Sequence, residues 1–165
     1  MKQLNWPRIL SGYVAALLLV TVWGAIVQAQ YNIAGLNSVG ADIPPGLRLG
    51  TTLRDIFSGF SPTYGGYVVA PSLAVAFAVA WKVAGSARET AALVWFGLAG
   101  GLAIAAGIPL VNFLSPVALL IGATRDLSCT ILMALGGVFG GLLFAKTAFL
   151  VHYDTRMPPP AMAAS

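Results

Sequence analysis

Four long runs of apolar residues, separated by short polar segments, dominate the pattern of the chain. They cover residues 9–29, 64–84, 90–111 and 125–151. An α-helix needs about 20 apolar residues to cross roughly 30 Å of hydrocarbon, and each run reaches that length. The pattern predicts an all-α membrane protein with four transmembrane helices in one domain, residues 1–151.

The first run admits a second interpretation. Lys2 and Arg8 precede it, and Val27 and Ala29 stand where a signal peptidase would require small residues. The apolar core of a secretory signal peptide is only about 7 to 15 residues long, which is shorter than this run. We therefore favour an uncleaved first transmembrane helix, ending in the headgroup zone at the polar residues Gln28, Gln30, Tyr31 and Asn32.

Residues 47–60 are amphipathic instead of continuously apolar. The apolar residues at the spacing of one helical face are Leu49, Leu53, Ile56, Phe57 and Phe60. The polar residues of the other face are Arg48, Thr51, Thr52, Arg54 and Asp55. This pattern predicts an interfacial helix between spans one and two, flat on the membrane, with its polar face towards water.

Several local signals mark the remaining segments. Pro71 predicts a kink in the second span. Leu114–Gly122 is apolar but covers at most half a bilayer, so we expect it to lie in the interface or to enter the membrane and return. Thr124 is the predicted N-cap of the fourth span, with Asp126 in its first turn. Residues 152–165 are predicted to be a disordered cytoplasmic tail.

Charge is sparse, at 8% of residues, with a formal net charge of +4. The basic residues are scattered singly between apolar runs, which excludes a nucleic-acid-binding stripe. The four spans place six basic residues on the side of the termini, namely Lys2, Arg8, Lys82, Arg88, Lys146 and Arg156. Only Arg48, Arg54 and Arg125 lie opposite, so the excess predicts that both termini are cytoplasmic.

Glycines with a spacing of four residues occur in two spans. They are Gly97 and Gly101 in the third span, and Gly136, Gly137, Gly140 and Gly141 in the fourth. Such positions let helix backbones approach closely within a membrane. We expect them to pack helices inside the monomer, and an oligomer interface is the alternative.

Charged residues near the ends of helices are the contact candidates for the non-cytoplasmic side. They are Arg48, Arg54, Asp55, Arg125 and Asp126. Together they could hold an anionic ligand or a partner protein. The alternative is that they form interfacial ion pairs or lipid-headgroup anchors, which contribute at most about 1 kcal/mol when exposed.

No group of residues has the composition of a catalytic centre. His152 is the only histidine and Cys129 the only cysteine. These numbers argue against a bis-histidine haem, a zinc site or a di-iron site. All five acidic residues lie outside the spans or at their ends, whereas proton-coupled transport usually needs a carboxylate deep in a span. We expect neither catalytic activity nor a bound cofactor or metal.

Several segments resemble a known group of proteins. They are Val27–Asn32, Arg48–Leu49 with Thr52 and Asp55, Gly59–Thr63, and Ala134–Gly136 with Gly140–Lys146. In these segments the chain resembles a family of small four-span inner-membrane proteins of proteobacteria that have no assigned function. The resemblance covers most of the chain and implies a four-span fold in the bacterial inner membrane, without implying a mechanism.

These observations favour a non-enzymatic membrane protein that acts through protein or lipid contacts, as an accessory subunit or assembly partner of a larger membrane complex. The alternative is an oligomeric small-solute transporter or channel subunit. A water-filled cavity would favour that alternative if it were lined by Gln28, Gln30, Asn32, Asn112 and Arg125. An enzyme with a lipid-soluble cofactor is a third hypothesis.

Overall fold

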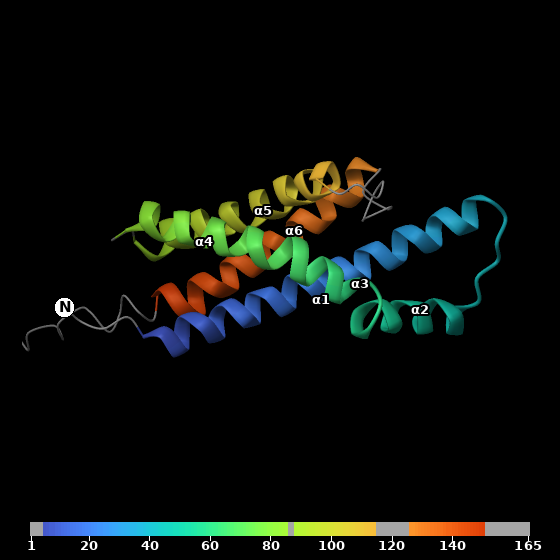
Figure 1. Cartoon of the computed structure of the whole chain (residues 1–165), viewed down its shortest axis with the longest axis horizontal. Helices are drawn as coiled ribbons and strands as arrows, with labels where there is room; N and C mark the ends of the chain where they lie inside the picture. Colours follow the sequence, from blue (N-terminus) through green and yellow to red (C-terminus); the bar gives the residue numbers. More distant parts are fainter. Residues whose placement is uncertain (1–4, 86–87, 115–125, 151–165) are drawn as a thin grey trace, which may run out of the picture.

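The computed structural model describes residues 5–85, 88–114 and 126–150, and this part of the chain is helical without any β-strand. Four of its helical segments are long and apolar enough to cross a membrane. They lie side by side along one common direction, and the chain enters the first helix and leaves the last at the same end of the bundle (Figure 1). We call this the terminal end and the opposite one the α2 end.

The first helix, α1 (Trp6–Ser38), has 33 residues. A helix of that size is about 50 Å long, against roughly 30 Å of hydrocarbon in a bilayer. It does not stop at the polar residues Gln28 to Asn32, where the sequence pattern placed the end of the span, because such residues are compatible with a helix. Its last turns project beyond the rest of the bundle (Figure 1).

Gly40 ends α1. Its φ of 88° lies in the left-handed region that glycine adopts without steric cost. The amide of Ala41 donates to the carbonyl of Leu36, and the amide of Gly40 donates to that of Asn37, at 3.2 and 3.1 Å. This pair of bonds is a Schellman motif, which satisfies two of the last carbonyls of the helix. The short loop that follows leads directly into the next helix.

Helix α2 (Pro45–Phe57) begins at a proline, which needs no amide hydrogen at that position. It runs back alongside the projecting part of α1 (Figure 1). The sequence pattern predicted an interfacial helix flat on the membrane over residues 47–60, and the structure has a helix there that packs along α1. The reason is the extra length of α1, which offers α2 a helical surface to pack on.

The second span is one continuous helix made of three pieces, α3 (Phe60–Thr63), η1 (Tyr64–Val69) and α4 (Ala70–Ala84). The middle piece is a π-helix, in which hydrogen bonds reach five residues back, and the amide of Ala70 accordingly donates to the carbonyl of Gly65. Pro71 follows directly. A wide turn next to a proline is a common way to accommodate its missing amide hydrogen.

The third span is α5 (Glu89–Leu114), and the fourth is α6 (Leu127–Phe144) followed by the π-helix η3 (Ala145–Leu150). The N-cap of α6 is Asp126, whose carboxylate accepts a hydrogen bond of 2.9 Å from the amide of Ser128. Asp126 was predicted to lie within the first turn and Thr124 to be the cap. A carboxylate is at least as good a cap as a threonine hydroxyl.

Some predictions fall outside the described residues. They concern the segment Leu114–Gly122 beyond its first residue, together with Thr124, Arg125 and the tail 152–165.

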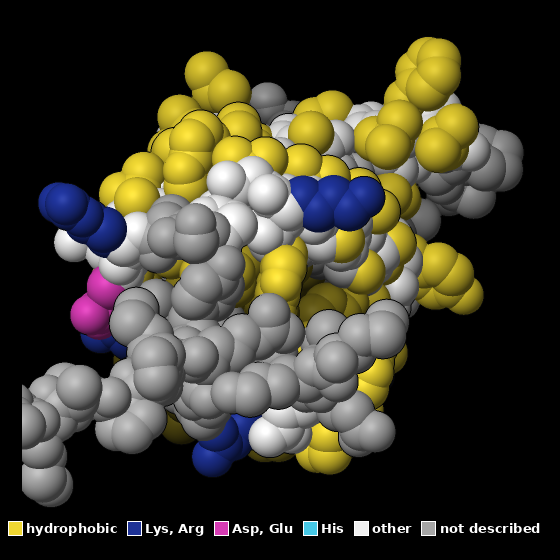
Figure 2. All heavy atoms as spheres, turned by 90° about the vertical axis from the view of Figure 1, so that its left-hand side faces the viewer, with side chains coloured by type: hydrophobic (Ala, Val, Ile, Leu, Met, Phe, Trp, Pro, Cys, Tyr) yellow, Lys and Arg dark blue, Asp and Glu magenta, His cyan; other side chains and the backbone are white. Residues whose placement is uncertain are grey.

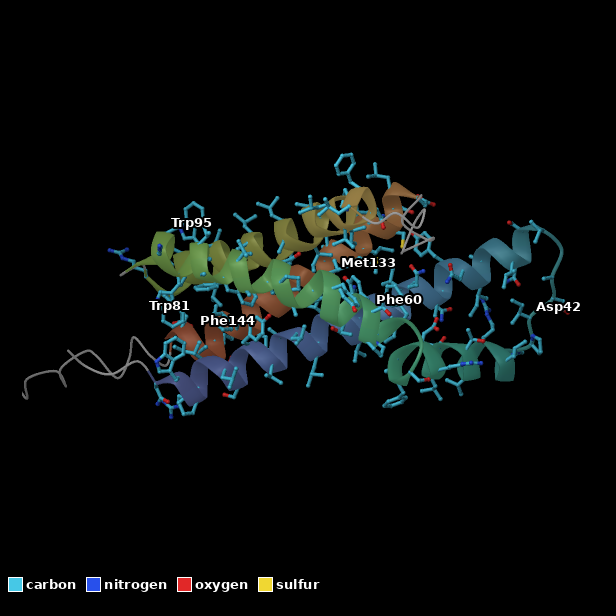
Figure 3. All side chains as sticks on the ribbon, in the orientation of Figure 1. Asp42, Phe60, Trp81, Trp95, Met133 and Phe144 are labelled. Carbon is cyan, nitrogen blue, oxygen red and sulfur yellow. The ribbon has the colours of Figure 1, made fainter. Side chains whose placement is uncertain are left out.

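Aromatic side chains fill the core at the terminal end of the bundle. Phe77 stacks on Phe144 with ring centroids 4.5 Å apart, and Trp81 and Phe96 meet the same cluster edge-on. Trp81 and Phe144 lie near each other between α4 and α6 (Figure 3). Aromatic pairs of this kind add about 0.5–1.5 kcal/mol each beyond their burial. The core of this half of the bundle therefore consists of aromatic rings in mutual contact.

Candidate functional site

The projecting part of α1 and helix α2 form a hairpin at one end of the bundle. The residues of α2 that are half-buried recur at helical spacing and so define the face turned to α1, namely Arg48, Thr51, Thr52, Asp55 and Ile56. The side-chain amide of Gln30 on α1 donates to Thr52 Oγ1 at 3.2 Å, and that hydroxyl donates to the carbonyl of Arg48 at 2.9 Å. The polar face of α2 therefore packs on α1.

Three apolar residues of α2 point away from α1, whereas Ile56 lies on the half-buried face. Leu49, Leu53 and Phe57, which we call the α2 stripe, are 63%, 45% and 79% exposed. They follow one another every four residues and so share a face. The sequence pattern placed Ile56 and Phe60 on the same face as these three residues, but both are half-buried, and it turned the polar face towards water. It could not know that the extension of α1 supplies Gln30 as a polar partner.

A second polar contact joins α1 to the start of α6. The hydroxyl oxygens of Tyr31 and Ser128 lie 2.6 Å apart, and Ser128 Oγ donates to Asp126 Oδ1 at 2.8 Å. Because the Ser128 hydroxyl has one hydrogen, it accepts the hydrogen of Tyr31. The hydrogen bonds from the backbone and side chain of Ser128 lower the pKa of Asp126 below its ordinary value.

The described charged contact candidates lie on two helices, α2 and α6. Arg48 and Asp55 lie on the half-buried face of α2, whereas Arg54 is exposed in its last turn. Asp126 caps α6. Arg125 lies outside the described residues, so the predicted pair with Asp126 has no described geometry.

The glycines of α6 face two different helices. Gly136 and Gly140 lie against Trp23 and Val20 of α1, whereas Gly137 and Gly141 lie against the backbone of Gly100 and Phe96 of α5. On α5, a Cβ at Gly97 would lie 3.4 Å from Leu142, and one at Gly101 would lie 2.8 Å from Val138. These glycines are thus used for packing inside the described bundle, and two neighbouring GxxxG patterns give α6 two separate contact faces.

The four described residues of the set proposed to line a transport cavity differ in their surroundings. Gln28 is buried inside the bundle, Gln30 contacts α2, and Asn32 is exposed. Asn112 is half-buried on α5, and Arg125 is not described. A groove of about 750 Å³ lies between α4 and α5, and its lining is mostly apolar, with Ser72 among the few polar groups.

Among the described residues, no group of three or more His, Cys, Asp or Glu side chains could hold a metal ion. The comparisons with known proteins add no relative. No family model, no curated protein and no solved structure matches the chain.

Proposed function

We propose that the chain is a non-enzymatic protein of the bacterial inner membrane that acts as an accessory subunit or assembly partner of a larger membrane complex. The observation that carries the proposal is the α2 stripe. It presents Leu49, Leu53 and Phe57 outwards from a hairpin at the end of the bundle. Apolar surface of this kind, displayed outside the hydrocarbon layer, is typical of a protein interaction site.

A partner protein fits the α2 stripe better than lipid. The helices α5 and α6–η3, of about 36–39 Å, are longer than the hydrocarbon layer is thick, which supports a position of the hairpin at or beyond the headgroups. A helix that rests on lipid lies in the plane of the interface. Because α2 runs along α1, its stripe points sideways into the aqueous or headgroup layer, where another protein can cover it.

The charge distribution supports cytoplasmic termini. At the terminal end, the described charged residues are Arg8, Lys82, Arg88, Lys146 and Glu89. At the α2 end they are Arg48, Arg54, Asp42, Asp55 and Asp126. Four described Lys and Arg residues thus lie at the terminal end against two at the α2 end, and cytoplasmic segments carry the excess of Lys and Arg. Basic side chains lie around the rim of the terminal end instead of forming one stripe (Figure 2).

Site-specific photocrosslinking in intact cells tests the proposal. A photoreactive amino acid at Leu53 or Phe57 should give a discrete crosslinked protein band. The matched control is Val75 on α4, which is similarly exposed, at 66%, but lines the apolar groove of the bundle. The proposal fails if Leu53 and Phe57 yield only lipid adducts.

A substitution provides the second arm. Leu53→Arg should abolish the crosslink at Phe57 and leave the melting temperature of the purified protein unchanged, because Leu53 is exposed in the chain alone. Loss of thermal stability in this variant would instead mean that the α2 stripe serves the fold.

A further inference from the structure

Four buried polar side chains lie on the helices that pack where α1 passes α3 and η1. They are Thr21 and Gln28 of α1, Ser61 of α3 and Tyr64 of η1, and each is at least nine-tenths buried. The oxygens Thr21 Oγ1, Gln28 Oε1, Ser61 Oγ and Tyr64 Oη have no hydrogen-bond partner in the protein. We call these four residues the polar seam.

The contacts of two glycines fix how the two helices face each other. A Cβ on Gly65 would lie 2.9 Å from Thr21 Oγ1, and a Cβ on Gly24 would collide with the ring of Tyr64. Helix α1 and the second helical segment run in opposite directions. Gln28 therefore lies nearer the α2 end than Thr21 on α1, and Ser61 lies nearer that end than Gly65 on the facing helix. Thr21, Gln28, Ser61 and Tyr64 therefore belong to one continuous contact.

The position of the seam beside the π-helix is also informative. Turns of this kind interrupt regular hydrogen bonding and are frequent at functional sites. Phe60 stacks on Tyr64 with ring centroids 4.9 Å apart and lies at the α2 end of the bundle, where α3 passes α1 (Figure 3). The Tyr64 ring is thus held between Phe60 and Gly24, which fixes the place of its hydroxyl.

A buried hydroxyl or amide without a partner is costly, and lipid cannot supply the missing hydrogen bonds. Water can supply them, since one molecule donates two and accepts two hydrogen bonds and typically makes about three inside a protein. The four seam groups are all neutral. The close approach of the helices at Gly24 and Gly65 argues for a ligand no larger than water.

We propose that the polar seam is a binding site for ordered water molecules, which bridge Tyr64 and Gln28 and join α1 to the π-helical part of the second span. The site is independent of the α2 stripe and of the proposed function.

Removal of the Tyr64 hydroxyl tests the site, because the melting temperature should change in opposite directions with and without bound water. If water bridges the hydroxyl, Tyr64→Phe lowers the melting temperature in lipid nanodiscs by about 2–4 °C, the shift that a hydrogen bond produces in a protein of this size. If the hydroxyl is bare, the same substitution removes an unpaired polar atom, so the melting temperature stays constant or rises. That result would overturn the proposal.

Two other tyrosines serve as matched controls. The hydroxyl of Tyr13 donates directly to the carbonyl of Ala70 at 2.6 Å, so Tyr13→Phe measures how far the melting temperature falls when one tyrosine hydrogen bond is lost. Tyr67 is 71% exposed, so Tyr67→Phe measures the change in melting temperature when an exposed hydroxyl is removed. Tyr64→Phe should match Tyr13→Phe and differ from Tyr67→Phe.

A double substitution and a structure complete the test. Residues bridged by shared water are coupled, so Tyr64→Phe with Gln28→Met should lower the melting temperature by less than the sum of the single changes. An experimental structure of the unmodified protein in nanodiscs should show water within hydrogen-bond distance of at least two seam oxygens. A direct hydrogen bond between Tyr64 and Gln28 with no such water would refute the proposal, whatever the variants do.

Discussion

The indole nitrogen of Trp23 on α1 donates a hydrogen bond of 2.8 Å to the carbonyl of Leu132 on α6. The contact depends on Gly136, since a Cβ at that position would collide with the indole ring. Trp23 also meets Phe139 edge-on, with ring centroids 5.4 Å apart. One glycine thus admits an aromatic side chain that bonds to the backbone of a neighbouring helix.

Trp23→Phe should destabilise the protein by about 1 kcal/mol, because it keeps an aromatic ring but removes the hydrogen-bond donor. Thermal unfolding in mild detergent measures the change. Trp95→Phe is the control, since Trp95 is 45% exposed. Equal effects of both substitutions would mean that the bond to Leu132 contributes nothing.

Gly100→Ala and Gly137→Ala should each destabilise strongly or prevent folding, because the backbones of these two glycines touch and neither can yield to a methyl group. Gly35→Ala should act in the opposite direction. Its Cβ would meet nothing within 4 Å, and alanine is favoured over glycine in a helix by about 1 kcal/mol. Equal tolerance at all three positions would contradict the close contact of α5 and α6.

Thiol labelling should reveal which face of α2 is covered. In a Cys129→Ser background, single cysteines at positions 49, 53 and 57 of the purified protein should react quickly with a small water-soluble reagent. Cysteines at 48, 52 and 55 should react slowly, since that face packs on α1. The sequence alone predicts the reverse order, so the experiment separates the two arrangements directly.

The Asp126 cap should make stability depend on pH. The hydrogen bonds from Ser128 lower the folded pKa of Asp126 below its ordinary value of 3.8. A depressed folded pKa stabilises the protein at pH above that ordinary value, and the contribution is lost as pH falls through the folded pKa. The melting temperature of the native protein should therefore fall more steeply below about pH 4 than that of Asp126→Asn.

Reporter fusions should place both ends of the chain in the cytoplasm. A fusion after Gly85 or at the C-terminus should give a cytoplasmic signal, and one at Gly40 should give the opposite signal. A cytoplasmic Gly40 would reverse the orientation and remove the α2 stripe from the non-cytoplasmic side.

The four apolar runs, without any long-range information, predict where helices can cross a membrane, because length and apolarity decide that property. The last residue of α1 cannot be predicted in this way, since Gln28 and Gln30 are compatible both with the headgroup layer and with a continuing helix. The Schellman motif at Gly40 shows that the glycine, and not the polar residues, ends the helix.

The candidate sites depend on contacts between helices, which periodicity does not contain. The α2 stripe can be read from sequence, but its direction depends on Gln30 reaching Thr52. The polar seam combines single polar residues of two helices, and their register becomes known only when Gly24 meets Tyr64. A signal for it was nevertheless present, because Thr21 and Gln28 are two turns apart on one helix face.

The two glycine faces of α6 have a consequence for the order of assembly in the cell. Helix α1 makes its most extensive contacts with α6, which is synthesised last of the four spans, and touches α4 only slightly. The face of α1 that carries Ala16, Val20 and Trp23 is therefore uncovered until α6 has been synthesised, since Leu132, the hydrogen-bond partner of Trp23, follows it by 109 residues. During that interval α1 is open to other membrane helices, so a partner or an insertion factor present at that stage could bind a surface that the finished bundle hides.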